Sequence, residues 1–225
     1  MAKIHGVPGE WARVKGVITG LVPVFAAVFA LGVAVTLALV GSLVVGMTLL
    51  LVSLSAGLYC AVKGFRRIER HFLGARGEER VAGILASLSE RYHVFNDFTA
   101  CGTNVDHVVV GPAGVFAVET KFWNGKVTIE DGRILVDGER PSRPPLSQIQ
   151  RESDCVRREL EKTGWRGAVT PLLVFASDSF ASHIAELNGV VVINSNQILE
   201  SFSTDRIVVA SDEIDRLVAL MENNV

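Results

Sequence analysis

The feature that most constrains this chain is an uncharged segment of 46 residues, from Val17 to Val62. As one helix it would be about 69 Å long at 1.5 Å per residue, more than twice a hydrocarbon core of about 30 Å. Two spans fit instead, over residues 17–40 and 43–62, with a reversal near Gly41-Ser42. The apolar region of a cleaved signal peptide is shorter, at roughly 7–15 residues. The segment predicts a two-helix transmembrane hairpin, and a buried hairpin in a soluble domain is the alternative.

The flanks of this segment predict its orientation. Basic side chains lie just outside both spans, and the turn between them has no charge: Lys15, Lys63, Arg66 and Arg67. By the positive-inside rule both ends face the cytoplasm, which predicts a multi-pass protein of the cell membrane with both termini cytoplasmic. Small residues within the spans would let the helices approach closely. They are Gly32, Gly41, Gly46 and Gly57.

The hairpin divides the chain into unequal parts. Residues 1–16 form a short cytoplasmic N-terminus, residues 63–73 a basic juxtamembrane linker, and residues 74–225 a globular domain. Residues 1–70 carry a net charge of +5, so the chain's net charge of −2 leaves −7 for the remainder. An acidic domain lacks the overall basic character of a tight, non-specific DNA binder, although a local basic strip can exist within it.

Cysteine usage indicates a reducing compartment. The three cysteines are isolated and form no Cys-x-x-Cys pair, which argues against a zinc site and against a disulfide scaffold. They are Cys60, Cys101 and Cys155.

The globular part alternates helical and strand patterns. A helix is expected over residues 77–92, where Val81, Leu85 and Leu88 share one face. The expected strands are 93–98, 104–110, 115–121, 126–130, 133–136, 169–175 and 190–193, and the later helices are 146–162, 195–202 and 211–222. Asp131-Gly132 is a strong hairpin signal between two of these strands. The order predicts a mixed α/β domain with helices on both sides of a central sheet.

Three charged residues, Asp106, Glu119 and Lys121, interrupt the two most apolar neighbouring strands. If residues 111–114 connect these strands so that Val110 faces Val115, then Asp106 falls opposite Glu119. Their Cβ atoms would lie about 4.5–5.5 Å apart. Lys121 shares the face of Glu119, since side chains alternate along a strand. Two facing carboxylates among apolar residues are unfavourable unless a positive charge lies between them.

A divalent cation would satisfy this requirement. Mg²⁺ is bound by one or two carboxylates together with water and substrate phosphate. With Asp106 and Glu119 as metal ligands and Lys121 beside them, the group could hydrolyse a phosphodiester. The alternative is that Lys121 only neutralises one of the acids within a structural ion-pair network.

Two further residues are candidates for the same site. Glu78 lies on the inward face of the first globular helix, although a carboxylate in a first turn often only complements the helix dipole. Gln148 lies early in a later helix and could hydrogen-bond a water or a phosphate, although by itself it resembles any surface glutamine. His107 alternates away from Asp106 and is interpreted as structural.

The pattern as a whole resembles the nuclease-related domain (NERD) family, which is similar to PD-(D/E)xK endonucleases and Mrr-like restriction enzymes. The resemblance rests on GARGEERV, NVDHVVVGPAGVFAVETK, PPLSQIQ and VTPLLVF, and runs from about Gly74 to Phe202. It implies a restriction-endonuclease-like mixed sheet flanked by helices. The usual Asn-Pro before the helix glutamine reads Pro144-Pro145 here, which leaves the choice of Gln148 over Gln150 less secure.

The resemblance also implies roles for the candidate residues. Glu78 would be the acid of the first helix, Asp106 and Glu119 the metal ligands, and Lys121 the active-site lysine, with Gln148 as the helix glutamine. The implied cofactor is Mg²⁺ or Mn²⁺. The partner that the resemblance implies is nucleic acid (DNA before RNA). The apolar hairpin separately predicts the lipid bilayer as a partner, and a second copy of the chain or another protein is a further candidate.

Three hypotheses of function remain open from the sequence. The leading one is a membrane-anchored, metal-dependent nuclease facing the cytoplasm. The second is a non-catalytic membrane adaptor that uses the nuclease fold to bind nucleic acid or protein. The third, an oligomerising or channel-like role of the hairpin itself, ranks last because no charged group lies within the spans.

Overall fold

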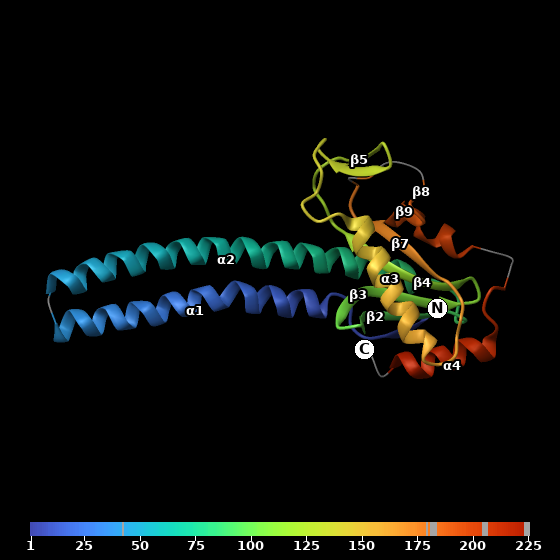
Figure 1. The fold of residues 1–225 in the computed structure, drawn as a ribbon, viewed down its shortest axis with the longest axis horizontal. Helices are drawn as coiled ribbons and strands as arrows, with labels where there is room; N and C mark the ends of the chain where they lie inside the picture. Colours follow the sequence, from blue (N-terminus) through green and yellow to red (C-terminus); the bar gives the residue numbers. More distant parts are fainter. Residues whose placement is uncertain (42, 179, 181–183, 204–206, 223–225) are drawn as a thin grey trace. The chain divides into compact units, whose positions relative to one another are not determined.

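The computed structural model describes the chain except residues 42, 179, 181–183, 204–206 and 223–225. It consists of two compact units (Figure 1). One is formed by Trp11–Leu73 and the other by Met1–Glu10 together with Gly74–Val225.

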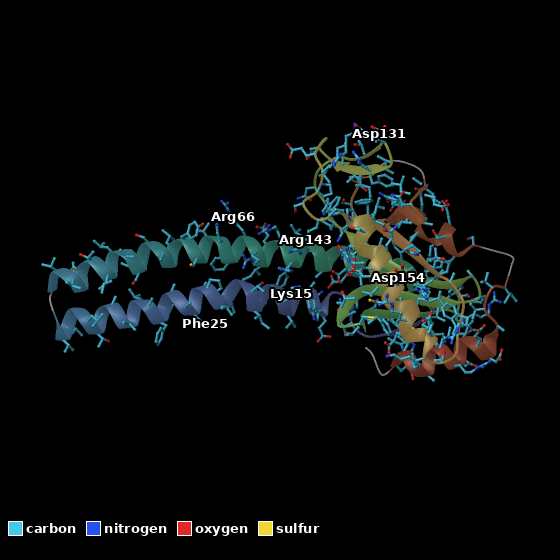
Figure 2. The ribbon with its side chains drawn as sticks, viewed as in Figure 1. Lys15, Phe25, Arg66, Asp131, Arg143 and Asp154 are labelled. Atoms are coloured by element: carbon cyan, nitrogen blue, oxygen red, sulfur yellow. The ribbon has the colours of Figure 1, made fainter. Side chains whose placement is uncertain are left out.

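The first unit is a pair of long helices that run side by side (Figure 1), α1 (Glu10–Val40) and the first part of α2 (Leu43–Leu85). Both are long and apolar enough to cross a membrane by length and composition, with hydropathies of 2.4 and 2.0 in their most apolar windows. Only 11% and 6% of those windows is buried, and Phe25 projects away from α2 (Figure 2). The helices are therefore not the buried hairpin of a soluble core. The predicted reversal includes Ser42, which lies outside the described residues.

A close approach of the two helices lies at Gly20 and Gly64, neither of which was among the predicted glycines. A Cβ on Gly64 would lie 2.6 Å from the carbonyl oxygen of Gly20, so that crossing requires glycine. Gly57 makes only an ordinary contact, 3.5 Å from the Cβ of Ala27, and a Cβ on Gly32 would meet open space. Gly41 approaches only Leu37 of its own helix. The prediction from small residues was wrong for Gly32 and Gly41, because composition does not show which face of a helix is covered.

The basic segment 63–73 is helical and continuous with its neighbours, since α2 is unbroken from Leu43 to Leu85. The helix predicted to continue to Tyr92 ends at Leu85. There the amide and the hydroxyl of Ser87 both donate to the carbonyl of Ile84, and the amide of Leu88 donates to that of Leu85. These bonds to the last carbonyls of the helix close it with a tighter turn. Leu88 is buried as expected, but outside the helix.

The second unit is built on a mixed seven-stranded sheet (Figure 1) in the order β1-β2-β3-β4-β7-β9-β8. The strands are β1 (Lys3–His5), β2 (His93–Ala100), β3 (Thr103–Gly111), β4 (Gly114–Lys121), β7 (Val169–Phe175), β8 (Ala185–Leu187) and β9 (Val190–Asn194). β2, β3 and β4 form an antiparallel meander, whereas β4, β7 and β9 are parallel to one another. A separate hairpin joins β5 (Val127–Glu130) to β6 (Arg133–Val136). Asp131 and Gly132 have the positive φ angles that its turn requires.

Helices and apolar side chains cover both faces of the sheet. On one face, α3 (Pro145–Glu161) and α4 (Ser211–Met221) bury Ile149, Val156 and Leu217 in a cluster with Ala117 and Leu173. On the other face, the end of α2 and the 3-10 helix η1 (Ser195–Phe202) bury Val81, Leu85 and Ile198 against Val118 and Leu172. The prediction of an α/β domain with a mixed sheet and helices on both sides is confirmed.

Two strands were not predicted from the sequence. β1 lies within the segment interpreted as a plain N-terminus, and it pairs in parallel with β2, Lys3 opposite His93 and His5 opposite Phe95. The other is β8, an antiparallel neighbour of β9. Each has only three residues, too few to show an alternating pattern. β1 places Met1–Glu10 in the globular unit, although these residues precede both long helices.

Candidate active site

The register between β3 and β4 places the predicted acids together. Val110 pairs with Val115 and His107 with Val118, as the sequence analysis expected. Gly111 also pairs with Gly114, so the connection is a two-residue turn and not the four-residue loop assumed. The shorter turn preserves the register, because it adds one pair without shifting the others. Continuing the register by one residue brings Asp106 opposite Glu119.

Asp106 ends the ladder between the two strands. Its Oδ2 accepts a hydrogen bond of 2.7 Å from the backbone amide of Thr120, two residues beyond Val118, the last paired residue of β4. The Asp106 side chain thus accepts the hydrogen bond that a main-chain carbonyl of a neighbouring strand would accept from β4. This bond fixes the carboxylate where the pairing of β3 with β4 stops, beside Glu119.

Glu119 is the centre of a hydrogen-bond network. Its side chain is only 4% exposed, and Oε1 accepts from the ammonium of Lys121 and, at 2.7 Å, from Nε2 of Gln148. The Lys121 ammonium also donates to Oε1 of Gln148 at 3.1 Å. The network therefore joins the end of β4 to the first turn of α3.

Glu78 reaches the same region from α2. It is 8% exposed and lies one turn before Val81 on the inward face, whereas its neighbour Glu79 is exposed. Its charge contributes to a raised pKa of Asp106. Because α2 and α3 cover opposite faces of the sheet, Glu78 and Gln148 approach the ends of the strands from opposite sides.

Glu152 belongs to this network and was missed by the sequence analysis. It is 4% exposed, and its Oε1 accepts a 2.9 Å hydrogen bond from Nε2 of Gln148, the group that also donates to Glu119. A signal for it existed. Glu152 occupies the apolar stripe of α3, between Ile149 and Val156, where a carboxylate is costly unless it has partners.

The ionisation of these groups reflects a surplus of acid. Burial, then the charges of Glu119 and Glu78, raise the pKa of Asp106 well above its ordinary value. Burial and the charge of Glu119 raise the pKa of Glu152 to about 8, so it is largely protonated at neutral pH. Burial alone would lower the pKa of Lys121, but the Glu119 and Asp106 carboxylates outweigh it and raise that pKa. Lys121 therefore stays charged and offsets only part of the negative charge.

The donor set fits a hard divalent cation bound by two carboxylates. Among the residues that the structure describes there is no group of three or more histidine, cysteine or acidic side chains arranged to hold a metal. Mg²⁺ does not require one, since it commonly uses one or two carboxylates with water and substrate phosphate. A cation between Asp106 and Glu119 would relieve the repulsion that raises the pKa of Asp106.

Two residues set aside or left open in the sequence analysis lie away from this cluster. His107 is fully buried with Nδ1 2.8 Å from Oδ1 of Asn96, and burial lowers its pKa to about 3. It is neutral, in keeping with a structural role. Gln150 donates to the backbone carbonyl of Asn188, so Gln148 is the glutamine that the fold brings to Glu119.

Comparison with known proteins gives one match. The family model described as "Nuclease-related domain" (NERD) matches residues 73–176, a range that contains the whole cluster around Glu119. Neither the curated proteins nor the solved structures contain a match to this chain.

Proposed function

Because residues 73–176 of this chain match the nuclease-related domain family, we propose that the protein is a metal-dependent phosphodiesterase that hydrolyses nucleic acid, DNA before RNA. The observation that carries the proposal is the group of carboxylates where the pairing of β3 with β4 stops. Asp106 and Glu119 lie together with Lys121 and Glu78, and the pKa of Asp106 is raised first by burial and then by the charges of Glu119 and Glu78. In this proposal the fold is of the restriction-endonuclease type, with the meander and β7 as its central strands.

Each residue of the cluster has a chemical role in the proposal. Asp106 and Glu119 would hold Mg²⁺ or Mn²⁺, which when bound polarises a phosphoryl oxygen and lowers the pKa of a water. Lys121, charged and hydrogen-bonded to Glu119, would donate to the attacking water or to a non-bridging phosphate oxygen. Gln148 would keep Glu119 and Lys121 in place, since it bonds to both. Glu78 would add negative potential from the opposite side of the sheet.

The two long helices would hold this domain at a membrane. Their length and composition suit two spans, and their apolar side chains are largely exposed. The basic residues at the ends of the spans predict that both termini face the cytoplasm. In this proposal the domain boundaries remain those of the sequence analysis, with the addition that β1 belongs to the globular unit. Protease treatment of inside-out vesicles should degrade the globular unit, and its protection there would contradict the topology.

Nuclease activity can be tested on the full chain in detergent micelles. The full chain is required because a fragment beginning after the hairpin would lack β1. Labelled single-stranded DNA, double-stranded DNA and RNA would be incubated with Mg²⁺, Mn²⁺ or EDTA. We expect cleavage with a metal, none in EDTA, and none by Glu119→Gln. Glu186→Gln, at an exposed site on β8, removes the same charge and should leave cleavage unchanged.

The outcomes separate the enzyme from the adaptor. Metal-dependent cleavage lost only in Glu119→Gln supports the enzyme. Nucleic-acid binding without cleavage under any condition would support the non-catalytic adaptor. The acidic character of the globular part favours neither, because it weakens non-specific binding in both cases.

A further inference from the structure

A pocket lies beside the acidic cluster, and the roles proposed above do not use it. Its volume is about 610 Å³, and it is bounded by the turn between β2 and β3, the loop before α3, and the first turns of α3. The lining residues that matter here are Cys101, Arg143, Gln148, Arg151, Glu152 and Cys155. Figure 2 labels Arg143, in the loop that leads into α3.

The pocket adjoins the proposed catalytic residues. Gln148 and Glu152 line it, and Gln148 also donates to Oε1 of Glu119 at 2.7 Å. A group bound in the pocket would therefore be separated from Glu119 by a single side chain. If a nucleic-acid strand is cleaved beside Glu119, the neighbouring part of that strand must also bind the protein, and this pocket lies where it would pass.

The charge of the pocket wall suits an anion. Arg143 and Arg151 are exposed, and neither guanidinium has a hydrogen bond or ion pair within the part of the chain that the structure describes. A guanidinium matches the oxygens of a phosphate through paired hydrogen bonds. The one carboxyl group of the wall, Glu152, accepts a hydrogen bond from Gln148, and the two arginines outnumber it.

The start of α3 adds to this potential. Pro144 is the N-cap, and no side chain caps the helix. Pro144 and Ser147 both line the pocket, so the positive end of the helix dipole is directed toward it. Uncapped helix N-termini bind phosphate groups through their free amides.

We propose that this pocket binds the backbone phosphate next to the scissile one, with Arg143 and Arg151 as its ligands. The inference rests on the proposed function and specifies how the substrate is held. It also shows how an acidic domain can capture a polyanion, because the positive charge is confined to the place where the strand enters. Arg143 and Arg151 are thus positioning residues for a nucleic-acid strand.

The first test measures occupancy of the pocket by protection of a thiol. Cys101 is exposed, whereas partial burial and then the neighbouring Cys101 thiol raise the pKa of Cys155 to about 11, so Cys155 reacts slowly. The protein would be the full chain in micelles with Glu119→Gln, to prevent cleavage, and Cys60→Ser. A single-stranded oligodeoxynucleotide should slow alkylation of Cys101 several-fold. With Arg143→Glu and Arg151→Glu added, the oligonucleotide should give no protection.

The second test measures binding. The double arginine variant should lose about tenfold in affinity for each arginine, as expected for hydrogen bonds to a charged group. The slope of log affinity against log salt should fall by about 0.7 for each lost contact with a single strand. Arg216→Glu, an equal charge change on α4 outside the pocket, should change neither value much. Duplex DNA and RNA would be measured in parallel to identify the strand that fits.

The outcomes distinguish this inference from the proposed function. If the wild type cleaves nucleic acid but the double arginine variant binds like Arg216→Glu, the pocket assignment is overturned and the function stands. Binding that depends on the two arginines, without cleavage by the wild type, supports the pocket and rejects the catalysis. Absence of both binding and cleavage overturns both.

Discussion

Two polar groups lie on successive residues of β3, Asp106 partly buried and His107 fully buried, and they are stabilised in opposite ways. His107 is fully buried, neutral, and hydrogen-bonded to Asn96 on the neighbouring strand. Asp106 points to the other face, where Glu119 and Glu78 crowd it and Lys121 supplies compensating charge. The first pair is a neutral contact through Nδ1 of His107. The second group lies among other acids that raise its pKa, and perturbed acids of this kind are typical of functional sites.

The largest expected effect comes from removing charge at Asp106. Asp106→Asn retains an oxygen that can accept from the Thr120 amide, but it removes a metal ligand. Cleavage should fall more than about 100-fold, since replacing even a residue that supports a metal ligand costs 10–100-fold. Thermal stability in EDTA should be unchanged or higher, because a raised pKa means that the charge opposes folding. A drop in stability equal to that of a core substitution would instead assign Asp106 a structural role.

The neutral pair should behave in the opposite way. Asn96→Ala leaves Nδ1 of buried His107 without its partner, which should cost about 1–3 kcal/mol of unfolding free energy. At roughly 2–4 °C per kcal/mol for a domain of this size, the melting temperature should fall measurably. Cleavage per folded molecule, determined with the fraction folded from circular dichroism, should stay within about twofold of wild type. Loss of activity without loss of stability would remove the distinction between the two groups.

The titrations of His107 and Glu152 should change the free energy of unfolding with pH in opposite directions. The pKa of His107 is lowered to about 3, so the unfolded chain binds the extra proton below pH 6.5. Its contribution to stability is complete above pH 6.5 and declines as the pH falls toward 3. Replacing this residue by His107→Gln should flatten the acid side of a melting-temperature profile. An unchanged acid side would mean that other groups control it.

The titration of Glu152 should lower the stability of the protein on the alkaline side of the melting-temperature profile. Its pKa is raised from 4.5 to about 8, so its contribution to stability is complete below pH 4.5 and declines as the pH rises toward 8. Glu152→Gln mimics the protonated carboxyl and can still accept from Gln148. In EDTA it should flatten the melting-temperature profile between pH 5 and 8, the smallest of these effects. A variant less stable than wild type at pH 8 would contradict the assignment of a protonated Glu152.

Much of the fold could be predicted from the sequence where the signal was local. The uncharged run gave the two long helices, and the alternation of β-branched residues gave β3 and β4. The expected pairing across the turn after Val110 then brought Asp106, Glu119 and Lys121 close together. This works because the register of a buried hairpin follows from its turn and from the alternation of side chains between the two faces. The short strands β1 and β8 lacked such a signal. So did the crossing at Gly20 and Gly64, because only the partner helix determines which glycine is needed.

The sequence by itself determined the pair of facing carboxylates, because the two strands are neighbours in the chain and a short turn sets their register. Only the tertiary structure decided that Gln148 and Glu152 meet them, and that Cys101, Arg143 and Arg151 share one pocket. These residues come from segments far apart along the chain, and the packing of α3 across the sheet brings them together. The physical reason is that local periodicity fixes the direction of a side chain relative to its own strand or helix. What it meets there depends on which distant element buries its apolar face against the same surface.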